Sequence, residues 1–90
     1  MTKKKILVID DDTRLRNLLG HFLQENDFEA DLVGDTTQAK EILEKKKFDL
    51  MVVDVMMRGE SGIEFTKSYR KSGDIPILIL TARGESSDRI

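Results

Sequence analysis

The sequence predicts an α/β fold, an open doubly wound parallel sheet with helices on both faces. Four short apolar runs, at residues 6–9, 28–32, 48–53 and 77–80, have the length and composition of strands. Stretches with helical spacing separate them. Strands that alternate with helices in this way are joined by right-handed crossovers, so the sheet is expected to be parallel.

The first strand is predicted at residues 6–9, where an unbroken aliphatic run is typical of a strand buried on both faces. Asp12 or Thr13 can cap the helix that follows. Its apolar side chains recur at offsets of 0, 3, 4, 7 and 8, which defines one helical stripe. The stripe consists of Leu15, Leu18, Leu19, Phe22 and Leu23.

Residues 26–27 interrupt this helix, and apolar side chains then alternate with acids at residues 28–32. Such alternation indicates a strand with one wet face, near an edge of the sheet. A second helix is expected to begin at residues 34–36. Its predicted inner face carries Ala39, Ile42 and Leu43.

The third strand is predicted at residues 48–53 and is followed directly by Asp54. A third helix over residues 63–70 presents Phe65 and Tyr69 to the core. Proline then opens the fourth strand, residues 77–80. The remaining residues suit a loop and the first turn of another helix, so the domain formed by residues 1–90 is expected to be incomplete.

The amino-acid composition excludes several classes of function. With 39% hydrophobic and 36% charged residues, the chain has the character of one globular domain. Its apolar runs are far shorter than the ~20 residues of a membrane span. A formal net charge of −2 provides none of the excess positive charge that is typical of nucleic-acid-binding domains. The absence of cysteine excludes disulfides and thiolate metal sites, and it suits a cytoplasmic protein.

Polar side chains follow three of the four predicted strands. Asp10 and Asp11 come after the first strand, Asp54 after the third and Thr81 after the fourth. In an open parallel sheet, ligands bind in the crevice outside the carboxyl ends of the strands. If these strands are neighbours, the four side chains meet there, and Asp54 stands at the rim, where a cation can reach it, rather than in the core.

Carboxylates that converge repel one another, and a hard divalent cation relieves that repulsion. Mg²⁺ suits a few carboxylates, retained waters and a phosphate. The cation would neutralise an incoming phosphoryl group, Asp54 would attack it, and the Thr81 hydroxyl would sense the product. Each residue alone has a simpler explanation, such as capping for the acids at a helix start. The prediction therefore rests on their joint occurrence.

Together these residues resemble the response-regulator receiver domain of two-component systems, specifically its OmpR/PhoB type. The similarity to receiver domains lies in residues 6–12, 49–57 and 77–83, with Gly59 and Gly62 between them. Residues 14–16 and 84–90 resemble the OmpR/PhoB type in particular. The similarity spans nearly the whole chain. The resemblance implies a flavodoxin-like fold with strand order 2-1-3-4, from which the family's fifth strand is missing.

The resemblance also implies a role for each site residue. Asp54 would be the phosphoacceptor and Thr81 the switch hydroxyl. Asp10 and Asp11 would be the acidic pair around Mg²⁺, with Asp11 favoured as a direct ligand, and Asp54 and the backbone carbonyl of Met56 would complete the protein ligands. The phosphoryl donor would be the phosphohistidine of a sensor histidine kinase. The chain would then be a phosphoacceptor switch rather than an enzyme.

The sequence departs from the family in two respects. Arg58 stands where the family usually has proline, which removes a constraint on that loop. Residues 1–90 also lack most of the fourth helix, the fifth strand and fifth helix, and the family's active-site lysine. Residues 77–80 would then be an exposed edge that self-associates, including by exchange of elements. DNA would be contacted only through an output domain outside this sequence.

Two alternatives remain at this point. Without the lysine, the chain could be an interaction module that has lost phosphorylation. The D-x-D pattern in residues 10–12 could instead mark a phosphohydrolase with an aspartate nucleophile on the first strand. In that class a threonine or valine is expected where Arg14 stands, which disfavours this alternative.

Overall fold

One parallel sheet organises the chain. The computed structural model describes residues 3–55, 61–71 and 73–80. Their strands lie in the order β2-β1-β3-β4, and every neighbouring pair is parallel. The predicted fold and strand order are therefore confirmed. The strands are β1 (Lys4–Ile9), β2 (Phe28–Val33), β3 (Leu50–Asp54) and β4 (Ile77–Leu80).

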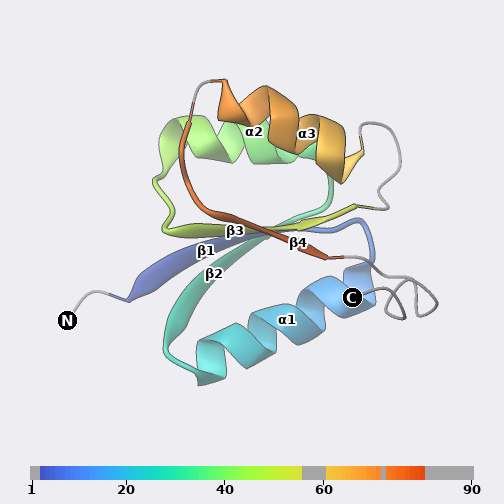
Figure 1. The fold of residues 1–90 in the computed structure, drawn as a ribbon. Coiled ribbons are helices and arrows are strands. Elements are labelled where there is room, and N and C mark those ends of the chain that lie inside the picture. The colour runs from blue at the N-terminus through green and yellow to red at the C-terminus, as the bar shows by residue number, and fades with distance from the viewer. Residues whose placement is uncertain (1–2, 56–60, 72, 81–90) are drawn as a thin grey trace.

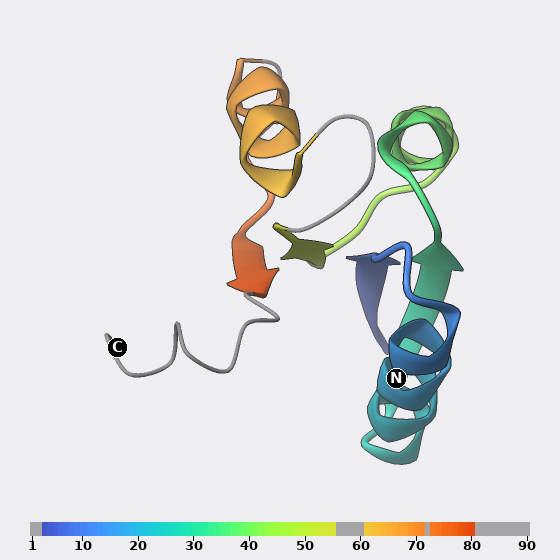
Figure 2. The same cartoon turned by 90° about the vertical axis from the view of Figure 1, so that its right-hand side faces the viewer.

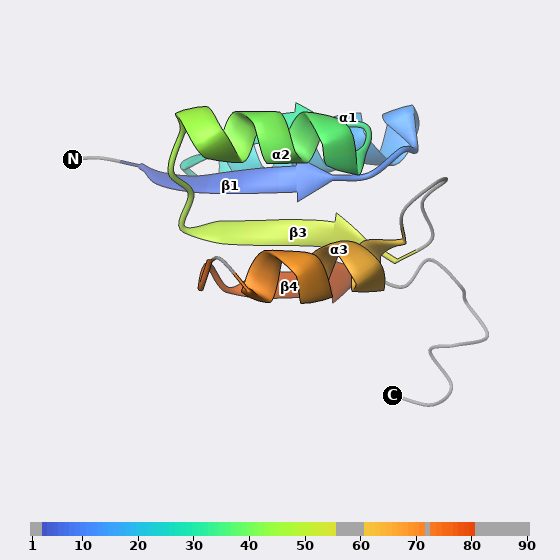
Figure 3. The same cartoon turned by 90° about the horizontal axis from the view of Figure 1, so that it is seen from above.

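Helices lie on both faces of the sheet, as predicted. Helix α1 (Thr13–Glu25) runs along one face, and α2 (Thr36–Lys45) and α3 (Gly62–Arg70) cover the other (Figure 1). The view turned by 90° shows the same three layers (Figure 2). From above, α2 and α3 run along the strands, with α2 toward β1 and α3 toward β4 (Figure 3). None of the described helices has the length and hydropathy needed to cross a bilayer.

Strand β1 is the centre of the core. Its side chains alternate between faces, so Leu7 and Ile9 pack under α2 and α3, while Ile6 and Val8 pack toward α1. All four are at most 3% exposed. Burial on both faces explains why this strand reads as an unbroken apolar run.

The stripe predicted on α1 is only partly buried. Leu19 and Leu23 pack against the sheet. Leu18 and Phe22, however, are 66% and 60% exposed. Periodicity had placed all of them on the buried side, and that prediction is wrong for these two. The stripe is wider than the contact that α1 makes with the sheet, and α1 is the single described helix on this face.

Capping residues fix where each helix begins. Asp12 accepts hydrogen bonds from the backbone N–H groups of Arg14 and Leu15 at the start of α1. Asp35 caps α2, and Ser61 forms a capping box with Glu64 at the start of α3. The cap at Asp12 leaves only two residues between it and the end of β1, so the turn that carries Asp10 and Asp11 is short.

Candidate functional site

Three carboxylates meet at the carboxyl ends of β1 and β3. One oxygen each from Asp10, Asp11 and Asp54 lies within 4.8 Å of the other two. The register explains this convergence, because Ile9 of β1 pairs with Val53 of β3 and the next residue of each chain segment is an aspartate. The predicted meeting of these three side chains is confirmed. Thr81 and Met56 lie outside the described residues.

Asp54 is more buried than its position at a strand end had suggested. It is 4% exposed, and Asp10 is fully buried. The expectation that Asp54 stands at the rim rather than buried is therefore wrong as regards burial. Asp54 pairs with Leu80 of β4, while Gly62 at the start of α3 lies against its backbone, so protein surrounds it on several sides. A buried carboxylate is costly unless a charge or hydrogen bonds compensate it.

Asp10 shows that the compensation within the described residues is incomplete. Its Oδ1 accepts a hydrogen bond from the Asp12 N–H at 2.9 Å. Its Oδ2 is buried and accepts no hydrogen bond from the described residues. Burial raises the pKa of Asp10, and the charge of Asp54 raises it further against the opposing effect of the Asp12 N–H.

These features fit a hard divalent cation. The ligand atoms that the described residues offer are carboxylate oxygens. One of them, Asp10 Oδ2, is buried and accepts no hydrogen bond from the described residues. Hard cations such as Mg²⁺ prefer oxygen ligands, and a positive charge here would offset the repulsion within the cluster. Among the described residues, this is the group of acids that the structure brings close enough to share one ion.

Sequence reasoning missed one residue beside this cluster. Arg16 Nη1 donates a hydrogen bond to the backbone oxygen of Asp10 at 2.7 Å. The available signal was its spacing, because Arg16 lies four residues after the cap Asp12, where a long side chain can reach back to the strand end. That spacing alone does not show which group the side chain contacts.

Gly62 brings α3 close to the end of β3. A Cβ at this position would overlap the backbone oxygen of Asp54 and lie 2.9 Å from its carbonyl carbon. The Gly62 N–H also donates to the backbone oxygen of Val55 at 3.3 Å. Only a residue without a side chain permits this approach.

We expect Gly62→Ala to destabilise the chain by about 1–3 kcal/mol, because the clash is with backbone and forces α3 away from β3. Gly20→Ala is the matched control. Its Cβ would meet the flexible end of Leu32 at 2.9 Å, and alanine favours a helix over glycine by about 1 kcal/mol. Urea unfolding compares the two variants. Equal free energies of unfolding would show that the approach at Gly62 is not tight.

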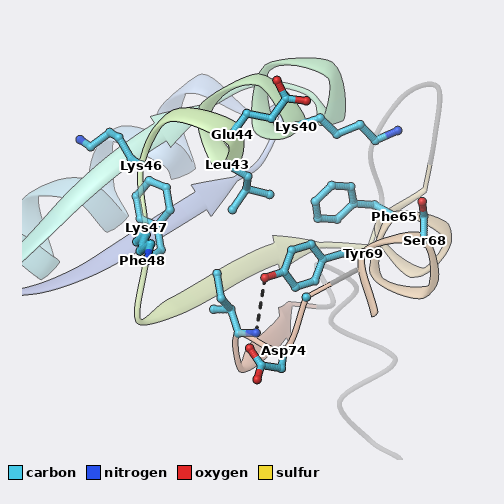
Figure 4. A pocket seen from close by; sticks show the side chains of 12 residues that line it. Lys40, Leu43, Glu44, Lys46, Lys47, Phe48, Phe65, Ser68, Tyr69 and Asp74 are labelled. Carbon is cyan, nitrogen blue, oxygen red and sulfur yellow. Dashed lines mark hydrogen bonds between the residues drawn. The ribbon is translucent and has the colours of Figure 1, made fainter. Parts of the chain in front are cut away.

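A separate cavity of about 720 Å³ lies between α2 and α3 (Figure 4). Phe48, Phe65 and Tyr69 form much of its wall, and the Tyr69 hydroxyl accepts from the Ile75 N–H at 3.4 Å. Residues just before β3 and β4 line it, so it lies at the amino ends of these strands, away from the aspartates. Its charged rim mixes both signs and favours no ligand class. These charged residues are Lys40, Glu44, Lys46, Lys47 and Asp74.

Known proteins are similar to this chain in sequence over most of its length. Protein PetR of Rhodobacter capsulatus is 45% identical over 85 residues, which cover 94% of this chain and 36% of PetR. The transcriptional regulatory protein ResD of Bacillus subtilis is 39% identical over 88 residues, which cover 96% of this chain. The chain thus spans about a third of the length of these relatives. That ResD is a transcriptional regulator agrees with the OmpR/PhoB type.

A solved structure extends the similarity to three dimensions. The response regulator TrrA of Thermotoga maritima, solved in complex with Mg(2+)-BeF, superposes with a TM-score of 0.83. It is 34% identical, and the alignment covers 97% of this chain and 76% of TrrA. The model of the response regulator receiver domain matches residues 6–90. Since that match takes in most of β1, all of β2, β3 and β4 and all three aspartates, the chain belongs to the family of response regulator receiver domains.

Proposed function

We propose that this chain is a phosphoacceptor switch in which Asp54 takes a phosphoryl group from the phosphohistidine of a sensor histidine kinase in the cytoplasm. Membership of the receiver family supports a role in phosphoacceptor signalling within a two-component system. The observation that supports Asp54 is its place in the cluster. It is a buried carboxylate within 4.8 Å of two others, at the strand ends where ligands bind in this class of sheet.

The chemical step would use the carboxylate of Asp54 as the nucleophile. One of its oxygens attacks the phosphorus, a P–O bond forms, and the P–N bond to the donor imidazole breaks. The imidazole leaves with the electron pair and takes up a proton. The product is an acyl phosphate on Asp54. Such a transfer depends mainly on positioning and on stabilisation of the phosphoryl oxygens.

The residues around Asp54 fit the Mg²⁺ that the family implies. The carboxylates of Asp10, Asp11 and Asp54 would hold the ion together with the backbone carbonyl of Met56. When bound, the ion would supply positive charge to the phosphoryl oxygens. The Thr81 hydroxyl would donate to one of these oxygens and so respond to phosphorylation.

Treatment of the chain with a small phosphodonor in the presence of Mg²⁺, followed by intact mass measurement, tests the proposal. A stable gain of one phosphoryl group supports it. No gain in a chain that binds Mg²⁺ would favour an interaction module that has lost phosphorylation. Continuous turnover of a generic phosphate ester would instead favour a phosphohydrolase.

The output of the switch is proposed to be transcription. ResD is a transcriptional regulatory protein, and this chain covers about a third of its length. We infer that residues 1–90 belong to a longer receiver domain and that DNA is contacted by a separate output domain. An assay of DNA binding by the 90-residue chain should then give no specific complex, in keeping with its net charge of −2.

We also propose that the chain self-associates along β4, including by exchange of elements. Among the described residues β4 pairs only with β3, and Leu78 is 53% exposed. An edge strand with exposed apolar side chains is a template for another chain. Size-exclusion chromatography with light scattering is expected to show a dimer, and Leu78→Lys is expected to shift it to monomer. A monomeric wild-type chain with a cooperative melt would contradict this.

A further inference from the structure

We propose that Arg16 is a positioning residue for the acidic cluster. In this assignment its guanidinium holds the peptide unit between Asp10 and Asp11, and so aims the Asp11 carboxylate toward Asp54. The inference rests on the proposed function where it concerns Mg²⁺ binding. It concerns a residue that neither donates a ligand atom nor accepts the phosphoryl group.

The main contact is a short, charge-assisted hydrogen bond. Arg16 Nη1 donates to the backbone oxygen of Asp10 at 2.7 Å, and Nη2 lies 3.4 Å from the Thr13 hydroxyl. The carbonyl of Asp10 and the amide of Asp11 belong to one planar peptide unit. Fixing the oxygen therefore fixes the plane through which the chain enters Asp11.

Two further hydrogen bonds hold the turn that carries Asp10 and Asp11. The Asp10 N–H donates to the backbone oxygen of Val33 at 3.1 Å. The Asp12 N–H donates to Asp10 Oδ1 at 2.9 Å. Arg16 adds a side-chain contact to the Asp10 carbonyl, so the backbone is held both before and after Asp11. Hydrogen bonds from neighbouring groups to a metal-binding residue orient that residue and change its affinity for the metal.

A second observation is that Gly34 leaves space for the guanidinium group of Arg16. A Cβ on Gly34 would lie 3.0 Å from Arg16 Nη1 and 3.7 Å from its Cζ, so the missing side chain leaves room for the guanidinium. The Gly34 N–H in turn donates to Gln38 Oε1 at 2.8 Å, which holds this loop to α2. Arg16 thus lies against both the turn after β1 and the turn after β2.

Charge and position predict opposite effects of removing Arg16. A positive charge beside the cluster opposes binding of a cation, so a purely electrostatic role predicts tighter Mg²⁺ binding after removal. A positioning role predicts weaker binding, because Asp11 is no longer aimed. The sign of the change therefore separates the two roles.

Calorimetric titration with Mg²⁺ is the first test. We expect Arg16→Met to bind Mg²⁺ about tenfold more weakly than wild type. Arg16→Lys should fall between them, because lysine keeps the charge and loses the planar fork. Arg14→Met is the matched control, since Arg14 is exposed on the same helical turn and carries the same charge. It should bind equally or more tightly. Equal or tighter binding by Arg16→Met would overturn the proposal.

Amide hydrogen exchange without metal is the second test. In Arg16→Met, the Asp12 N–H should exchange faster, whereas the Val8 N–H in the middle of β1 should not change. Gly34→Ala should act in the same direction by displacing the guanidinium. Unchanged exchange at Asp12 in Arg16→Met would overturn the proposal. If the wild-type chain binds no Mg²⁺, the proposed function fails, and this exchange measurement alone decides the role of Arg16.

Discussion

Asp54→Asn is expected to abolish phosphorylation while leaving the chain folded. The amide has nearly the shape of the carboxylate, so the buried site at the end of β3 keeps its packing. A neutral amide, however, is a poor nucleophile toward phosphorus. After treatment with a small phosphodonor and Mg²⁺, intact mass should show one added phosphoryl group on wild type and none on the variant.

The control for this experiment is Asp74→Asn, which removes an exposed carboxylate from the loop before β4. It should be phosphorylated as wild type is. Peptide mapping of the wild-type product should place the group on Asp54. Phosphorylation of Asp54→Asn to the wild-type level would mean that another residue is the acceptor, and the assignment of Asp54 would then be wrong.

Asp10→Asn is expected to stabilise the metal-free chain at neutral pH by about 1–3 kcal/mol, the scale of an uncompensated buried polar group. Asp10 is fully buried, and its Oδ2 accepts no hydrogen bond from the described residues. Asparagine removes the charge and keeps an oxygen that can accept from the Asp12 N–H. With Mg²⁺ present, the order should reverse, because wild type gains more binding energy from the ion than the variant, which keeps only two of the three carboxylates.

The pH dependence follows from the raised pKa of Asp10. The folded chain holds the Asp10 proton more tightly than the unfolded chain, for which the ordinary value is 3.8. The stability that protonated Asp10 contributes is therefore complete below pH 3.8, and it is lost as the pH rises through the pKa of Asp10 in the folded chain. Urea unfolding in chelator should show no advantage for Asp10→Asn at low pH and the full advantage at neutral pH. A variant less stable than wild type at neutral pH would contradict this account.

Much of the fold could be predicted because periodicity and topology determine it. The run at residues 77–80 coincides with β4, and Ala39 and Phe65 are buried as their spacing indicated. The meeting of Asp10 with Asp54 also follows from topology, since neighbouring parallel strands end at the same edge. These inferences need only the order of elements and the residues that end them.

The rest depended on neighbours that spacing does not reveal. Asp54 is buried because β4 and α3 close around the end of β3, which no local pattern encodes. The third strand was predicted two residues too early, since β3 begins at Leu50, although Phe48 still belongs to the core. Phe22 is exposed because a helical stripe gives a direction and not the area of the surface opposite it. Arg16 was missed because its spacing from Asp12 does not show which group its side chain contacts.

The central claim is that the aspartates after β1 and β3 bind one divalent cation together. Calorimetric titration of Mg²⁺ into the wild-type chain and into Asp11→Ala tests it most directly. Asp11 is half-buried and lies within 4.8 Å of the other two carboxylates, so its loss should leave an incomplete set of ligands. We expect one binding site in wild type and a large loss of affinity in Asp11→Ala. Equal affinity in the two proteins would contradict it.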